Sequence, residues 1–145
     1  MPDWRKPFKE MVIGKGRVIR EGEKVAILSI GHPGNFVVTA MKELAKEEIH
    51  PAHYDLRFVK PIDQELLHGI FKNFSSIITI EDGTIVGGFG SAVQEFMINN
   101  NYQARIQTLG IPDSFVEQGT QRQLYKECGF DPASIADTVR KVWDQ

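Results

Sequence analysis

The sequence predicts an α/β fold, a three-layer sandwich with a mostly parallel sheet of about five strands and one antiparallel edge strand. Apolar runs typical of buried strands alternate with segments of helical period, at about 25 to 30 residues per unit. This alternation favours parallel strands joined by right-handed crossovers, with helices on the faces of the sheet. A length of 145 residues suits a single domain with one core.

Four apolar runs are expected to form the buried strands. Residues 25–31 (VAILSIG) are rich in β-branched side chains and end at glycine, as a strand buried on both faces does. Similar runs follow at residues 53–59 (HYDLRFV), 76–82 (SIITIED) and 104–110 (ARIQTLG). Residues 11–24 (MVIGKGRVIREGEK) indicate a short β element turned by EGEK, so we expect an edge strand or hairpin there.

Three segments between these runs each carry one apolar stripe at helical spacing. The stripes are Phe36, Val37, Ala40, Met41 and Leu44, then Leu66, Leu67, Ile70, Phe71 and Phe74, then Phe89, Val93, Phe96 and Met97. Two further helices are predicted near the end of the chain. Thr120 and Gln123 form a capping box for the first, and Gly129 is expected just after its last turn. Asp131 and Pro132 begin the second. Its apolar positions are Ile135, Val139, Val142 and Trp143.

The composition excludes several classes of function. The 17 basic and 19 acidic side chains give a formal charge of −2, without the basic surface that nucleic-acid binding needs. Cys128 is the only cysteine, which rules out an intramolecular disulfide and favours a reducing compartment. No apolar run approaches the roughly 20 residues that a membrane helix needs. We therefore expect a cytoplasmic domain at residues 12–145, with residues 1–11 as a linker or strap from a preceding domain.

Ligands of open parallel sheets bind outside the carboxyl ends of the strands, and four loops are expected there. They are residues 31–35 (GHPGN), 60–63 (KPID), 81–90 (EDGTIVGGFG) and 110–120 (GIPDSFVEQGT). The first loop places His32 beside helix N-terminal N–H groups that suit a phosphate. A plain strand-to-helix turn, with glycine and proline for its geometry, is favoured over a phosphate site, because neither a Walker sequence nor a dinucleotide fingerprint is present.

The charged residues around the second loop have structural explanations. Lys60 before Pro61 is forced into an extended conformation, which ends the strand, and Asp63 is placed to cap the next helix. Arg57 is expected to form an internal or interface ion pair, with Asp55, Asp63 or Glu81 as its partner. The alternative for Arg57 is anion binding.

The third loop is a glycine-rich turn in front of a helix, the arrangement that often binds an anion. The stretch GFGSAV departs from the G-x-G-x-x-G pattern at its final position. Gly87, Gly88 and Gly90 are instead expected to let a helix approach the sheet or another subunit closely. Glu81 and Asp82 are adjacent on a strand and point to opposite sides, so we expect them to anchor the turn.

No catalytic, cofactor-binding or metal-binding set of residues is predicted. His50 and His53 have an H-x-x-H spacing, but Pro51 breaks a helix there, so both histidines are expected on a solvated loop. The remaining candidates are residues for an interface or for anion binding. They are His32, Arg57, Lys60, Asp63, Glu81, Gly87, Gly88 and Gly90.

Four segments occur in this order along the chain: IGKGRVIREGEKVAILSIG, YDLRFVKPID, TIEDGTIVGGFGSAV and LGIPDSFVEQGTQRQLYKECGFDPASI. Together they resemble the C-terminal domain of the 1-deoxy-D-xylulose-5-phosphate synthase family, thiamine-diphosphate enzymes of the transketolase superfamily. The pattern D-x-R-x-x-K-P-x-D at residues 55–63 is similar to transketolase-like C-terminal domains broadly, including 2-oxo-acid dehydrogenase beta subunits. The G-I-P-D and Q-G-T motifs, at residues 110–113 and 118–120, single out the synthase family. The loop GHPGNF, at residues 31–36, differs from the sequence that is usual in that family.

This resemblance implies a homodimeric parent enzyme that condenses pyruvate with glyceraldehyde 3-phosphate, losing carbon dioxide, with thiamine diphosphate and magnesium. In the family the cofactor-binding and proton-transfer residues belong to two earlier domains, so no catalytic residue is carried over. The chain is therefore expected to be an inactive scaffold that supports the dimer and the preceding domains and binds no cofactor itself. One alternative is the same domain of a 2-oxo-acid dehydrogenase beta subunit or a transketolase. Another is a free-standing module that binds a phosphorylated metabolite through His32, Arg57 and the turn at residues 87–90.

Overall fold

A mixed five-stranded sheet forms the middle layer of the structure, a computed structural model that describes residue 7 and residues 10–143. The strands are β1 (Arg17–Arg20), β2 (Val25–Ser29), β3 (Ala52–Asp55), β4 (Ser76–Thr84) and β5 (Arg105–Ile111). Their order is β1-β3-β2-β4-β5, with β1 antiparallel to β3 and the other neighbours parallel. The predicted α/β fold with an antiparallel edge strand is confirmed. Most of the predicted linker lies outside the described residues.

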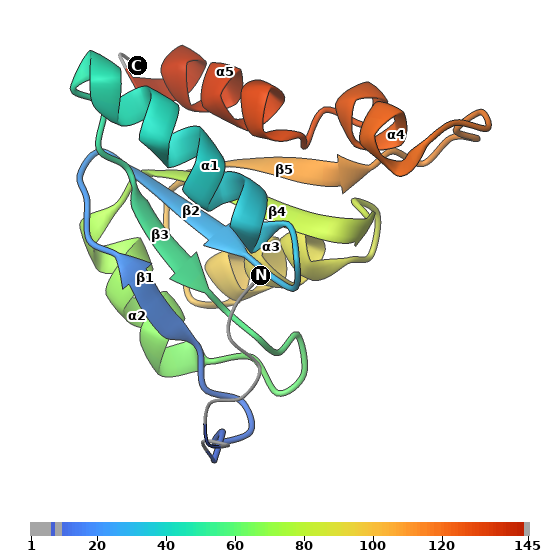
Figure 1. Ribbon diagram of the computed structural model, residues 1–145. Coiled ribbons are helices and arrows are strands. Elements are labelled where there is room, and N and C mark those ends of the chain that lie inside the picture. Colours follow the sequence, from blue (N-terminus) through green and yellow to red (C-terminus); the bar gives the residue numbers. More distant parts are fainter. Residues whose placement is uncertain (1–6, 8–9, 144–145) are drawn as a thin grey trace.

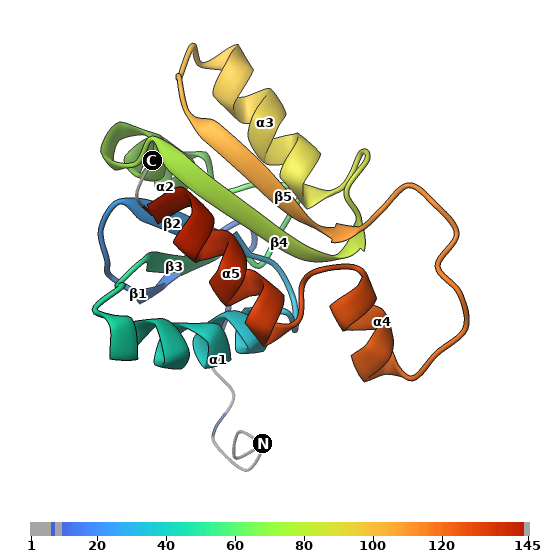
Figure 2. The same ribbon diagram turned by 90° about the horizontal axis from the view of Figure 1, so that it is seen from above.

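Helices cover both faces of the sheet (Figures 1 and 2). They are α1 (Gly34–Leu44), followed by the short 3-10 helix η1 (Ala45–Glu47), α2 (Gln64–Asn73), α3 (Phe89–Asn99), α4 (Gln121–Glu127) and α5 (Pro132–Trp143). The helices α1 and α5 pack on one face, and α2 and α3 pack on the other. No helix among the described residues is long and apolar enough to cross a membrane.

Strand β2 lies between two hydrophobic layers, and it is therefore buried on both faces. Val25 and Ile27 face the layer under α1 and α5, whereas Ala26 and Leu28 face the layer under α2 and α3. Full burial of a large aliphatic side chain contributes about 1.5–3 kcal/mol to folding. The continuous apolar run that predicted this strand thus reflects burial on two sides.

The predicted helix caps in the last part of the chain are confirmed. Thr120 Oγ1 accepts a hydrogen bond from the Gln123 N–H, and Gln123 Oε1 accepts one from the Thr120 N–H, which completes the capping box before α4. Gly129 has a φ of 75°, the left-handed conformation expected after a helix. Asp131 Oδ1 accepts a hydrogen bond from the Ser134 N–H at the start of α5.

Strand β3 is shorter than the predicted run of residues 53–59. It ends at Asp55, whose Oδ1 accepts a hydrogen bond of 3.1 Å from the Arg57 N–H. This side-chain turn places Arg57 at a φ of 57°, outside the strand conformation. The strand therefore ends before Pro61, not because of it, and the Lys60–Pro61 peptide bond in the following loop is cis.

Candidate functional site

The loops that follow β2, β3, β4 and β5 lie along the carboxyl edge of the sheet, where an open α/β sheet binds its ligands (Figure 1). In the loop after β2, the first N–H groups of α1 already bond to the loop itself. The N–H groups of Asn35 and Phe36 donate to His32 O and Pro33 O, each at 2.9 Å. The structure therefore favours the plain strand-to-helix turn over a phosphate cradle at this helix.

The turn between β4 and α3 is closed by a buried carboxylate. Glu81 is 5% exposed, and its two oxygens accept hydrogen bonds of 2.9 Å from the N–H groups of Phe89 and Gly90. These are the donors that an anion at the start of α3 would need. Glu81 thus anchors the turn as expected and takes the place of an external anion.

Each glycine of this turn has a distinct structural reason. Gly87 has a φ of 74°, which favours glycine. A Cβ on Gly88 would lie 2.1 Å from Thr84 O, and one on Gly90 would lie 2.4 Å from Thr108 Cγ2 on β5. The turn and the first residues of α3 therefore lie directly on the sheet, so the close approach expected at Gly88 and Gly90 is made within this domain.

His32 belongs to a surface cluster that joins three segments at the carboxyl edge. Its Nδ1 lies 3.3 Å from Asp82 Oδ2, and the Tyr125 hydroxyl donates to the same oxygen at 3.4 Å. The His32 ring also meets Phe36 edge-on, with centroids 5.0 Å apart. Asp82 thus connects the loop after β2 with α4, on the side of β4 opposite to Glu81.

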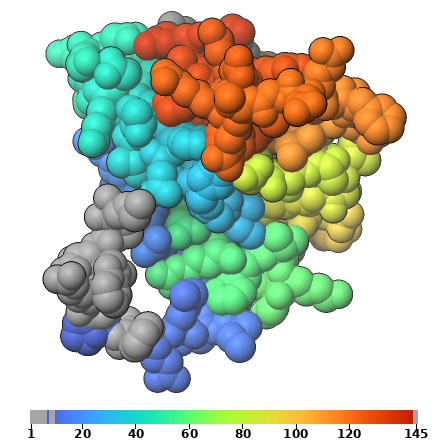
Figure 3. All heavy atoms as spheres, turned by 45° about the vertical axis from the view of Figure 1, so that its right-hand side comes forward, coloured from blue at the N-terminus to red at the C-terminus, as the bar shows by residue number. Residues whose placement is uncertain are grey.

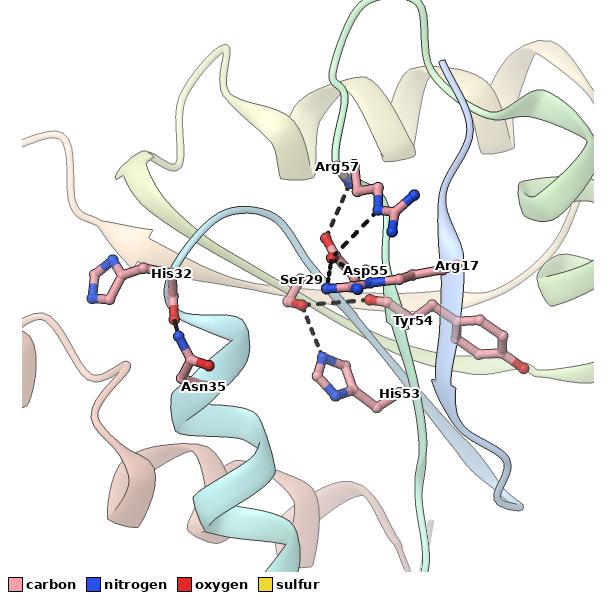
Figure 4. Close-up of polar contacts among 8 residues, drawn as sticks. All are labelled: Arg17, Ser29, His32, Asn35, His53, Tyr54, Asp55 and Arg57. Carbon is pink, nitrogen blue, oxygen red and sulfur yellow. Dashed lines mark hydrogen bonds and ion pairs between the residues drawn. The ribbon is translucent and has the colours of Figure 1, made fainter. Parts of the chain in front are cut away.

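Arg57 pairs with Asp55, one of the three partners expected for it. The Nε of Arg57 lies 4.0 Å from Asp55 Oδ2, and Arg17 on β1 donates to the same oxygen through Nε at 3.0 Å. Figure 4 shows the two arginines approaching this carboxylate from different sides, while His32 lies apart from them. Asp55 is therefore shared between two cations, and its charge offsets part of theirs.

The remaining charged candidates lie away from this group. Asp63 caps α2 through the Leu66 N–H at 3.1 Å, as predicted, and also accepts a hydrogen bond from the Gly16 N–H at 2.9 Å. Burial alone raises the pKa of Asp63, but these two hydrogen bonds and nearby Lys15 outweigh it and hold the pKa below its ordinary value. Lys60 is exposed on the loop after β3.

Sequence reasoning missed a buried polar pair beside Asp55, and the expectation that His53 lies on a solvated loop is wrong. His53 is on β3 and 1% exposed, and its Nε2 lies 2.8 Å from Ser29 Oγ on β2 (Figure 4). Burial lowers the pKa of His53 to about 4, so the ring is neutral near pH 7. Its Nδ1 has no hydrogen-bond partner among the described residues. A serine inside an apolar run and the H-x-D alternation of residues 53 and 55 were the available signals.

The eight predicted residues therefore do not form one binding site. His32 and Glu81 line a common cavity of about 250 Å³, but Asp63 lines a different one, beside Val18 and Glu21. No group of three or more His, Cys, Asp or Glu side chains in the described part of the chain is placed to hold a metal ion. A thiamine diphosphate does not fit the turn before α3, because Glu81 holds the donors that its diphosphate would need.

The fold and its carboxyl edge define a small, doubly wound α/β domain in which Glu81 bonds to helix N–H groups, Asp82 contacts His32, and Asp55 pairs with Arg17. The family model described as transketolase, C-terminal domain, matches residues 14–135. The chain belongs to the transketolase C-terminal domain family.

Its relatives include 1-deoxy-D-xylulose-5-phosphate synthases. The chain is 61% identical over 142 residues to the synthase of Cytophaga hutchinsonii, which covers 98% of the chain and 22% of that relative. It is 46% identical to the synthase of Parabacteroides distasonis, over 97% of the chain and 22% of the relative. The chain thus spans about a fifth of the length of the curated relatives it matches.

Solved structures agree with the family. A structure described as a split gene transketolase, inactive beta4 tetramer, superposes with a TM-score of 0.85 at 30% identity, over 97% of this chain and 46% of that one. The transketolase of Campylobacter jejuni has a TM-score of 0.61 at 16% identity, over 94% of this chain and 20% of that one, which shows the fold alone.

Proposed function

We propose that these residues are the C-terminal domain of a 1-deoxy-D-xylulose-5-phosphate synthase, an enzyme that condenses pyruvate with glyceraldehyde 3-phosphate and releases carbon dioxide. The observation that carries this proposal is the 61% identity with the Cytophaga hutchinsonii synthase over 98% of the chain. The coverage of only 22% of that relative supports a parent chain with further domains before this one. Residues 1–11 are then the connection to those domains.

Within such a parent, the domain acts as a scaffold that supports a homodimer and the preceding catalytic domains. The parent's thiamine diphosphate supplies the carbanion chemistry when bound, with magnesium, in those domains. The hydrogen bonds from Phe89 and Gly90 to Glu81 support this division, because they leave no open anion cradle at the start of α3. The product feeds isoprenoid and thiamine precursors in the cytoplasm.

The test compares the 145-residue chain with the parent chain that includes the residues encoded before it. Titration calorimetry with thiamine diphosphate and magnesium, and an assay for 1-deoxy-D-xylulose 5-phosphate, are applied to both. We expect cofactor binding and product only with the parent. Turnover by the 145-residue chain would refute the scaffold role. A parent that instead oxidises 2-oxo acids or transfers ketol groups between sugars would refute the synthase and favour another transketolase-like enzyme.

A further inference from the structure

A phenylalanine on the loop between β5 and α4 is fully exposed. Phe115 has a relative exposure of 107%, which is higher than that of the other exposed apolar residues described. It lies within residues 112–120, which form neither helix nor strand and stand away from the sheet (Figure 2). An aromatic side chain exposes about 150–250 Å² of surface that is normally buried in a core or an interface.

Both ends of this loop are fixed to the body of the domain. At its start, Ile111 O accepts a hydrogen bond of 3.0 Å from the Ile85 N–H. At its end, the capping box of Thr120 begins α4, and Tyr125 on that helix packs against Phe130 with ring centroids 5.0 Å apart. The space-filling view shows this orange segment projecting over the yellow-green turn after β4 (Figure 3). Because both ends of the loop are held by the body of the domain, less conformational entropy is lost when the loop binds a partner.

The surroundings of Phe115 indicate the chemistry of its partner. Asp113 and Glu117 flank it two residues away on each side, and residues 111–121 contain no lysine or arginine. Val86, which is 59% exposed, lies on the neighbouring turn, two residues after the β4 residue that pairs with Ile111. An apolar anchor between two carboxylates fits an apolar pocket that is edged by basic side chains.

We propose that residues 112–120 are a docking arm that inserts Phe115 into an apolar pocket, edged by Lys or Arg, in the domains that precede this one in the parent chain. This inference rests on the proposed function, because about four-fifths of the length of these relatives lies outside the part that the chain matches. A second copy of the arm is a poorer partner. A symmetric contact through this loop would bring Asp113 and Glu117 of both copies together.

The test measures how fast chymotrypsin cleaves the bond after Phe115, with mass spectrometry identifying the products. In the 145-residue chain this bond is exposed, so cleavage is expected to be rapid. In the parent, docking should slow cleavage at least tenfold, since the arm must leave its pocket before the protease binds. The double variant Asp113→Asn, Glu117→Gln keeps Phe115 and should restore several-fold faster cleavage in the parent. It should leave the rate in the 145-residue chain unchanged.

The control variant is Ile98→Ala. Ile98 is 67% exposed, but it lies near the end of α3, away from the carboxyl edge, so its replacement should not alter cleavage after Phe115. Equal cleavage rates in parent and isolated chain would overturn the inference. Protection that appears in the isolated chain as its concentration rises would overturn it too, because the occupant would then be a second copy. A protected arm in a parent without synthase activity would refute the proposed function and leave the docking arm standing.

Discussion

Replacing Gly90 with alanine tests whether the glycine-rich turn serves close packing of α3 on the sheet. A Cβ at this position would lie 2.4 Å from Thr108 Cγ2 and 2.7 Å from Thr79 Oγ1. Thr79 is fully buried and has no room to rotate. Thr108 faces the added Cβ with both branches, Cγ2 at 2.4 Å and Oγ1 at 2.9 Å, so exchanging them gives no relief. Carbon atoms in contact normally lie about 3.5–4.0 Å apart, so α3 must move off the sheet by roughly 1 Å.

The expected loss follows from two opposing effects. An extra methyl group forced into a packed core costs about 1–3 kcal/mol, and an overlap of this size indicates the upper end of that range. Alanine gains at most about 1 kcal/mol over glycine in a helix. The two effects together predict that Gly90→Ala lowers the free energy of unfolding by about 2 kcal/mol. The matched control is Gly69→Ala in α2, which meets no atom within 4 Å. Alanine at position 69 has a higher helix propensity than glycine and meets no steric overlap, so the free energy of unfolding should rise by about 0.5–1 kcal/mol.

Urea unfolding followed by far-ultraviolet circular dichroism measures both effects. The midpoint should fall for Gly90→Ala and rise for Gly69→Ala, with the same dependence on urea as the unchanged chain. If Gly90→Ala were as stable as the unchanged chain while Gly69→Ala gained stability, the packing explanation for the turn would be refuted.

Three further predictions concern buried or capping groups. Glu81→Ala leaves two N–H groups without their acceptor and should lower the free energy of unfolding, measured in urea, by about 3 kcal/mol. Glu81→Gln keeps one acceptor oxygen and should lower it clearly less. Equal losses for the two variants would contradict the role of Glu81 as a cap. Burial lowers the pKa of His53 from 6.5 to about 4, so between these pH values the unfolded chain binds a proton at His53 that the folded chain does not. The free energy of unfolding should therefore fall as the pH drops from 6.5 towards 4, by up to roughly 3 kcal/mol. His53→Gln should flatten this part of the pH profile and exposed His50→Gln should not. Thr120→Ala should cost about 1 kcal/mol, seen as faster hydrogen exchange in α4; unchanged exchange would count against the capping box.

Features that depend on neighbouring residues were predictable because their causes are local. The capping box of Thr120 and Gln123, the cap at Asp63 and the left-handed Gly129 each involve groups within a few positions of the chain. The buried strand at Val25–Ser29 was visible because burial on both faces requires a continuous apolar run.

The end of β3 shows where local reasoning stops. Residues 53–59 have the composition of a strand, yet the chain turns after Asp55. Asp55 makes that turn with its own side chain while also accepting a hydrogen bond from Arg17 of β1, 38 residues away. A composition pattern contains no information about that second contact.

The sequence by itself determined the succession of strands and helices along the chain, the antiparallel edge strand and the sites of the helix caps. Apolar periodicity and short-range hydrogen bonds depend only on residues that are near one another in the sequence. Only the tertiary structure decided which polar groups meet. The contact of Ser29 with His53, the sharing of Asp55 by two arginines and the hydrogen bonds from α3 to Glu81 join residues from different elements. Such contacts depend on strand register and on how closely each helix lies on the sheet, and those are set by packing of the whole core.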